Sequence, residues 1–377
     1  MIMEVNIGPV LINQRKQHHI TQQQLADFVG VSKAAVSKWE TGQSYPDITL
    51  LPSLAAYFNL QIDDLLDYEP QLSTSEIQNI YNTLKKSFTT EPGEEVLTKL
   101  RSLIRRYYAC YPFIQQMGLL ILNHFTSLPG KDVADKQARY VAEARQLFIH
   151  VRENTDDTTL KLNARNLEAY TLILLHKPQE VLTLLGTATP TYLPAENLIA
   201  TAYQMQHDTE KAQAVYQSAM YQHASVGMNY FTNYLTLLTA DPAKFTETYR
   251  RGKAYAEVFK MATLNPLVYL NFLLATIMGL AQQQQTTMLF QVLTHYVDVL
   301  SHTEFPPVLH GDAYFDQIDD WLDTLDSGHQ TPRNATMVQQ QLVEIIQQDP
   351  TLAAYRSDKR WLPLARKLKE VGQHGPQ

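Results

Sequence analysis

Two short amphipathic segments joined by a glycine constrain the fold of this chain more than any other feature of its sequence. The first begins at Thr21, and Gln24 lies three residues further on, which is the spacing of a helix-capping box. The connection contains Gly30, which can adopt a positive φ, and Ser32, which can cap the second helix. That second helix is expected over residues 33–41. Two short helices with a tight glycine turn predict a helix-turn-helix.

The apolar residues of both helices fall on one side at helical spacing. Leu25, Ala26 and Phe28 predict the buried stripe of the first helix. Val36 and Trp39 predict the buried face of the second. These two apolar faces would pack together in one small core.

The other face of the second helix is small, polar and cationic. A helix with such a face can enter the major groove of B-DNA, which is about 12 Å wide. Lysine and serine can donate hydrogen bonds to base edges or phosphates there, and alanine can touch a thymine methyl group. The residues of this outer face are Lys33, Ala34, Ser37, Lys38 and Thr41.

The residues around this motif resemble those of the Xre/Cro-type helix-turn-helix family over residues 7–67. The matching segments are Thr21-Gln22-Gln23-Gln24-Leu25-Ala26, Val29-Gly30-Val31-Ser32, Val36-Ser37-Lys38-Trp39-Glu40-Thr41-Gly42, Pro46-Asp47, Leu54-Ala55-Ala56-Tyr57-Phe58 and Ile62-Asp63-Asp64-Leu65-Leu66. The resemblance implies a lambda-repressor-like DNA-binding domain of five helices over residues 1–67.

The resemblance also implies roles for individual residues. Gln22 would lie against a DNA phosphate at the N-terminus of the first helix of the motif, where backbone amides favour anions. The outer-face residues of the second helix would contact bases or adjacent phosphates, although lysines on an isolated helix are usually only solvated. Arg15 and Glu40 match the internal ion pair of the family, so a structural role is favoured for Arg15 over a DNA contact.

Charge limits how such a domain can bind DNA. The chain has 31 basic and 38 acidic residues and a net charge of −7, which argues against a nonspecific nucleic-acid coat protein. Residues 1–60 contain four basic and four acidic residues. If Arg15 is paired internally, only three lysines remain for phosphates, and one copy should bind weakly. We therefore expect a homodimer on a two-fold related site in double-stranded DNA.

After a polar linker at residues 68–75, the sequence predicts helices throughout residues 76–377. Small and aromatic residues between 199 and 219 recur at the spacing of a tetratricopeptide repeat. The predicted fold class is all-α, with a tetratricopeptide-like superhelix after the DNA-binding domain, and a less regular helical bundle is the alternative. The repeat residues are Ala200, Tyr203, Ala212, Tyr216 and Ala219. The first helices of the region are expected over residues 77–88, 94–108, 113–125, 132–152, 160–175 and 180–185.

A stacked helical array presents a concave surface that commonly binds a peptide or a partner protein. A DNA-reading domain joined to such an array resembles the Rgg/PlcR-type peptide-responsive regulators, which implies that the array dimerises and binds a short signalling peptide. Asparagine amides can donate to and accept from a peptide backbone together. The alternatives are ordinary surface asparagines, and an array that only docks a partner protein. The candidate peptide-binding residues are Asn229, Asn233, Asn163 and Asn166.

Residues 101–111 form the most basic and aromatic segment of the chain. They are consistent with a second contact to DNA phosphates, with the wall of a ligand pocket, or with an ordinary amphipathic helix. The last interpretation is favoured, with buried tyrosines and with arginines paired to acids such as Glu94 and Glu95. Cys110, the single cysteine, is expected to be a small buried hydrophobic residue, because no second cysteine can pair with it.

The sequence lacks the patterns typical of enzymes and metal proteins. It has no phosphate-binding glycine loop, no His-Glu-x-x-His and no Gly-x-Ser-x-Gly, and its 12 histidines are dispersed. No catalytic residue, metal or cofactor is therefore expected. The apolar residues 267–281 are too few to span a bilayer and predict a buried helix. Because the first residues do not resemble a secretion signal, we expect a cytoplasmic protein.

Overall fold

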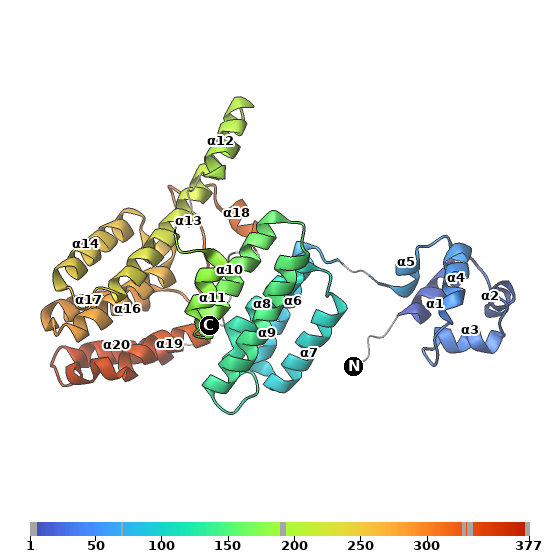
Figure 1. Ribbon diagram of the computed structural model, residues 1–377, viewed down its shortest axis with the longest axis horizontal. Helices are drawn as coiled ribbons and strands as arrows, with labels where there is room; N and C mark the ends of the chain where they lie inside the picture. Colours follow the sequence, from blue (N-terminus) through green and yellow to red (C-terminus); the bar gives the residue numbers. More distant parts are fainter. Residues whose placement is uncertain (1–5, 69–70, 189–193, 326–328, 330–334, 374–377) are drawn as a thin grey trace. The chain divides into compact units, whose positions relative to one another are not determined.

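All regular elements of the computed structural model are helices in the residues that it describes, 6–68, 71–188, 194–325, 329 and 335–373 (Figure 1). This confirms the predicted all-α class. The chain forms two compact units, Met1–Gly186 and Thr187–Gln377. The boundary between the units lies inside residues 76–377, for which the sequence predicts a single helical domain.

The first unit begins with a small helical domain around its own apolar core. Leu11, Leu25, Val36, Leu54 and Leu65 come from five different helices and are fully buried in that core. The five helices are the number that the resemblance implies. Their bounds are α1 Ile7–Gln17, α2 Gln22–Val29, α3 Lys33–Glu40, α4 Leu51–Phe58 and α5 Ile62–Leu66, with a short 3-10 helix, η1, at Ile48–Leu50.

Helices α6 to α11 follow in the described residues of the first unit. Phe113, Tyr140 and Phe148 are fully buried between α8 and α9, and Gly118 lets α9 approach α8 because its Cα faces the ring of Phe148. Cys110 is buried, as predicted. The helices are α6 Thr74–Thr90, α7 Gly93–Arg106, α8 Tyr111–His124, α9 Val133–Asn154, α10 Thr158–Leu174 and α11 Pro178–Leu185, with the 3-10 helix η2 at Phe125–Ser127.

The second unit is organised along one long helix, α13. The predicted repeat corresponds to the pair α12 and α13, and Ala200 and Ala212 are buried, as expected where two helices approach closely. The apolar residues 267–281 lie in α16, a buried helix packed between α13 and α17. The helices are α12 Ala195–Met205, α13 Thr209–Thr236, α14 Pro242–Val258, α15 Met261–Leu264, α16 Pro266–Gln282, α17 Thr286–His302, α18 Asp319–Thr324, α19 Ala335–Gln348 and α20 Trp361–Gln373, with the 3-10 helix η3 at Pro350–Tyr355.

Candidate nucleic-acid interface

The turn between α2 and α3 forms as its sequence predicts. The Thr21 hydroxyl oxygen accepts a hydrogen bond from the Gln24 backbone N–H at 3.2 Å, and the Gln24 side-chain oxygen accepts from the Thr21 N–H at 2.8 Å. Gly30 ends α2 in the left-handed region, with φ at 76°. The Ser32 hydroxyl oxygen then accepts from the Ala35 N–H at 3.2 Å and caps α3. These local contacts fix the orientation of α3 relative to α2.

A buried carboxylate joins α1, α2 and α3. Glu40 has a side chain that is only 4% exposed and lies 2.7 Å from the Arg15 Nε atom, so the internal ion pair expected from the resemblance is present. Arg15 also donates to the Ile20 carbonyl oxygen at 3.0 Å. The Gln22 side-chain amide donates to the second Glu40 oxygen at 2.9 Å. Gln22 therefore lies at the start of α2 as predicted, but its side-chain nitrogen is used within the domain.

The electrostatics of this network follow from its geometry. Burial alone would raise the pKa of Glu40, but the hydrogen bonds from Arg15 and Gln22 and the attraction of Arg15 outweigh it and lower that pKa. The hydrogen bond to Glu40 raises the pKa of Arg15. Both groups are therefore charged at neutral pH, and Arg15 is not available to an external anion.

The two faces of α3 differ as the sequence predicts. Val36 and Trp39 are buried in the core of the domain. The opposite face lies in solvent, with only Ser37 half-buried, and neither lysine on it forms an ion pair in the described residues. The Thr41 hydroxyl donates to the Ser37 carbonyl oxygen at 2.9 Å and so closes the end of the helix. The side chains on the outer face are Lys33, Ala34, Ser37, Lys38 and Thr41.

Three apolar side chains of the helix-turn-helix domain are exposed although the sequence did not predict it. Phe28, predicted in the buried stripe of α2, is 54% exposed, and its ring lies at 45° to the Tyr57 ring with centroids 4.2 Å apart. Tyr45 and Ile48 are exposed in the segment after α3. A proline and a capping Asp47 between them mark a turn in the sequence, but nothing there predicts the exposure of these side chains.

The helix-turn-helix family model matches residues 11–65, which include all of α2, α3 and α4. The transcriptional repressor RstR of a cryptic phage in Vibrio cholerae is 31% identical over 99 residues, 26% of this chain and 86% of RstR. The chain belongs to the Xre/Cro-type helix-turn-helix family.

One further relative and one solved structure are similar to parts of this chain. The transcriptional activator BcrR of Enterococcus faecalis is 39% identical over 74 residues, which are 20% of this chain and 36% of BcrR, so the chain spans about a third of that relative. The solved structure of PlcR from Bacillus thuringiensis, in complex with the peptide PapR7 and DNA, aligns with 70% of this chain and 99% of PlcR. Its sequence identity is 14% and its TM-score is 0.23, so the alignment carries no argument about the helical region.

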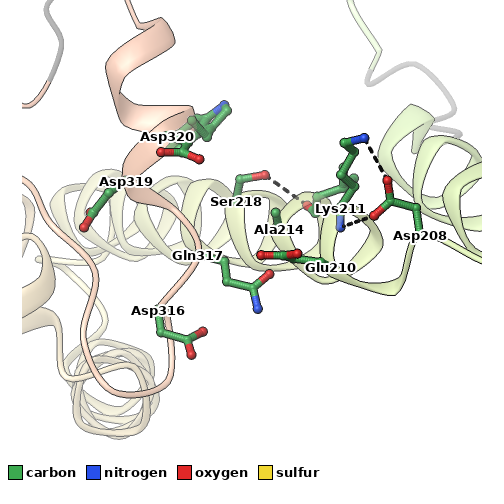
Figure 2. Close-up of a pocket in the computed structure, with 11 residues that line it drawn as sticks. Asp208, Glu210, Lys211, Ala214, Ser218, Asp316, Gln317, Asp319 and Asp320 are labelled. Atoms are coloured by element: carbon green, nitrogen blue, oxygen red, sulfur yellow. Dashed lines mark hydrogen bonds and ion pairs between the residues drawn. The ribbon is translucent and has the colours of Figure 1, made fainter.

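A separate pocket lies in the second unit, between the start of α13 and the segment that leads into α18 (Figure 2). Its volume is about 590 Å³. Lys211 forms an ion pair with Asp208 at 2.8 Å, and this contact lowers the pKa of Asp208. Most of the remaining charge that lines the pocket is acidic, with Trp321 as an aromatic wall. The acidic lining residues are Asp208, Glu210, Asp316, Asp319 and Asp320.

The four asparagines singled out in the sequence do not line this pocket. Asn229 and Asn233 are exposed on α13, further along the helix than the pocket residues. Asn163 and Asn166 are exposed on α10, in the first unit. Their contact with a peptide therefore stays a prediction, separate from this pocket.

Residues 101–111 differ from the favoured prediction in the pairing of their arginines and in the burial of Tyr108, and Arg105 and Arg106 form no ion pair in the described residues. Arg101 pairs with Glu143 of α9 at 2.7 Å, whereas Glu94 and Glu95 were the expected partners. Tyr108, expected to be buried, is 52% exposed because α7 ends at Arg106 and the chain turns outward there.

Metal-binding clusters and membrane-spanning helices are both absent from the described residues. No group of three or more histidine, cysteine, aspartate or glutamate side chains is arranged to hold a metal ion there. None of the helices in that part of the chain has the length and apolar character to cross a membrane.

Proposed function

We propose that this protein is a transcriptional regulator that binds a specific sequence in double-stranded DNA through α3. The observation that carries the proposal is that the two faces of α3 differ. Its apolar face is buried and fixes the helix, and its cationic face is exposed and forms no ion pair in the described residues. A helix held in this way at a glycine turn has the geometry that places outer side chains against base edges in the major groove.

The outer-face residues would have different roles. Lys33 and Lys38 can donate to phosphates or to guanine oxygen and nitrogen atoms, and the Ala34 methyl group can contact thymine. The Ser37 hydroxyl is half-buried and fits a short hydrogen bond to a base or phosphate. At the start of α2, the free backbone N–H groups supply the phosphate contact, because the Gln22 side-chain nitrogen is held by Glu40.

We also propose that the active form is a homodimer. With Arg15 paired to Glu40, the remaining basic residues within 1–60 are Lys16, Lys33 and Lys38. Three phosphate contacts give a salt dependence with a slope of about −2.7 for one copy, which is shallow for a specific regulator. Two copies on a two-fold related site double this contribution and the number of bases read.

Selection of duplexes from a random pool tests this function. The full-length wild type should enrich a two-fold symmetric motif, and Lys33→Ala/Lys38→Ala should enrich none. Arg366→Ala/Lys369→Ala is the matched control, because it removes two exposed cations from α20. Equal enrichment by the wild type and the α3 variant would show that α3 does not read DNA. Failure of the wild type to enrich any motif, with added peptides from spent medium as well as without them, would overturn the proposal.

For the helical region, we propose ligand sensing in preference to a purely protein-docking role. The supporting observation is the acidic pocket at α13 and α18, which has the volume of a ligand site. Its excess of carboxylates suits a cationic ligand such as a basic peptide, with Trp321 positioned to contact a cation. Asn229 and Asn233 remain candidates for contacts to a longer peptide on the same helix.

Thermal unfolding with short peptides rich in lysine and arginine tests this second proposal. A peptide at 100 times its Kd adds about 2.7 kcal/mol to the stability of the unit that binds it and raises its Tm. Glu210→Gln/Asp320→Asn should abolish the shift, whereas Glu304→Gln/Glu344→Gln, which changes two exposed acids outside the pocket, should not. A protein partner that co-purifies, without any peptide effect, would favour the docking role.

A further inference from the structure

The C-terminal end of α7 carries two arginines that the function above does not use. Arg105 and Arg106 are exposed, and neither forms an ion pair in the described part of the chain. Arg101, one turn earlier, is held by Glu143. We refer to residues 105–108 as the basic turn. The Arg106 guanidinium lies 5.3 Å from the Tyr107 ring centroid, so the cation is supported by an aromatic face while it stays in solvent.

The backbone of the basic turn is fixed against α9. The ring of Tyr108 stacks on His150 with centroids 4.0 Å apart, and the His150 Nε2 atom lies 3.0 Å from the Tyr108 carbonyl oxygen. Tyr107 packs edge-on against the buried Phe113. Two arginines at such a site are presented from a rigid surface, which lowers the entropy lost when they bind a ligand.

The basic turn is tethered close to the helix-turn-helix domain. On one side of the tether, the Tyr68 N–H donates to the Asp63 carbonyl oxygen at 2.9 Å, so Tyr68 still belongs to that domain. On the other side, the Gln71 side-chain amide donates to the Ala109 carbonyl oxygen at 3.3 Å, next to the basic turn. Three peptide steps of about 3.8 Å separate Tyr68 from Gln71, so their Cα atoms are at most about 11 Å apart.

This tether limits how far the two unpaired guanidinium groups can lie from the domain whose α3 would engage a duplex. DNA carries one phosphate charge per about 1.7 Å of its axis, so phosphates continue on both sides of the base pairs that one domain reads. The helix-turn-helix domain itself is poor in free cations, since its four basic residues within 1–60 include the paired Arg15. Guanidinium forks match phosphate oxygens in geometry as well as charge.

We propose that Arg105 and Arg106 bind backbone phosphates of double-stranded DNA that flank the base pairs contacted by α3. This inference rests on the proposed DNA-binding function. It assigns the end of α7, outside the helix-turn-helix domain, a direct share in DNA affinity. A purely structural role, in which the arginines only complement the negative C-terminal end of α7, would affect stability but not DNA binding.

Fluorescence anisotropy with two duplexes and the full-length protein tests the inference. One duplex contains only the selected motif, and the other extends it by about ten base pairs on each side, one helical turn. On the long duplex, Arg105→Ala/Arg106→Ala should reduce the slope of log K against log salt by about 1.8 for each copy bound, at about 0.9 per lost phosphate contact. At about 0.1 M salt this corresponds to a loss of about 10- to 60-fold in affinity for each copy bound. On the short duplex the variant should match the wild type.

Two further variants separate the possible outcomes. Arg105→Lys/Arg106→Lys keeps the charge and should recover most of the affinity for the long duplex, and Arg366→Ala/Lys369→Ala should change nothing. If the alanine variant binds the long duplex like the wild type while Lys33→Ala/Lys38→Ala loses binding, the flanking contact is refuted and the function of α3 stands. If the α3 variant also binds normally, the proposed function itself fails. A lower Tm with unchanged salt slopes would assign the arginines a structural role only.

Discussion

Replacing Arg15 by methionine tests whether the buried ion pair holds the helix-turn-helix domain together. The change keeps an apolar stem and removes the charge that faces Glu40, whose side chain is 4% exposed, leaving that carboxylate only the Gln22 amide. Removal of one partner from a buried pair costs about 3–5 kcal/mol. The Arg15 side chain is itself 17% exposed, which favours the lower end of that range. We expect the variant domain to lose about 3 kcal/mol at pH 7.

The loss should depend on pH with a definite sign. In the wild type the folded-state pKa of Glu40 is lowered, so its stabilisation is present above the unfolded-state pKa and is lost as pH falls through the folded-state value. In Arg15→Met, burial acts with less opposition and should raise that pKa, so the cost appears only as pH rises through the unfolded-state value of about 4.3. The difference in unfolding free energy between the two proteins should therefore grow from acid to neutral pH.

Urea unfolding followed through Trp39 measures this difference in the intact chain. The protein has three tryptophans, and Trp321→Phe/Trp361→Phe leaves Trp39, in the core of the helix-turn-helix domain, as the only reporter. With an m-value of about 1 kcal/mol/M for a small domain, a loss of about 3 kcal/mol shifts the midpoint by about 3 M. Lys16→Met, which removes an exposed cation from the same helix, should cost less than about 0.5 kcal/mol. A difference under about 1 kcal/mol for Arg15→Met, or one that does not change between pH 4 and pH 7, would refute the reasoning.

Two substitutions in the turn give further predictions, measured with the same reporter. Gly30→Ala should lower the unfolding free energy by about 1–2 kcal/mol because φ is 76°, and not through a clash, since nothing lies within 4 Å of the added Cβ. Gly30→Asn should lower it by less, because asparagine adopts positive φ more readily, and equal losses would contradict this account. Ser32→Ala should lower the unfolding free energy by about 1 kcal/mol through loss of the α3 cap, and Ser32→Asp, which can also cap the helix, should keep most of that stability. If Ser32→Asp is no more stable than Ser32→Ala, the cap contributes little.

The helix-turn-helix domain was predictable because its signals are local or shared by a family. The capping box at Thr21, the glycine at position 30 and the serine cap at position 32 each act within three or four residues. The pairing of Arg15 with Glu40 spans 25 residues, and it was accessible only through the resemblance. The all-α class was likewise accessible, since it follows from helical spacing along the whole chain.

The features that depend on distant packing were not predictable from local patterns. Arg101 finds Glu143, 42 positions away, because α7 packs near α9, and no spacing rule ranks that acid above Glu94 or Glu95. The acidic pocket combines residues near 210 with residues near 320, and the contact between Gln217 and Asp316 that links these segments spans 99 positions. Helical periodicity likewise placed Phe28 on the apolar side of α2, but it could not show that Val29 packs against the core while Phe28 stays exposed.

The central claim, that the outer face of α3 reads bases, is tested most directly by repeating the duplex selection with Ala34→Gln/Lys38→Gln. Both positions are exposed, and glutamine is a good helix former, so the domain should fold. Glutamine pairs with the hydrogen-bonding edge of adenine, whereas lysine prefers guanine. The account predicts a motif that differs from the wild-type motif at one or two symmetric pairs of positions and is unchanged elsewhere. An identical motif, enriched as strongly as with the wild type, would contradict it.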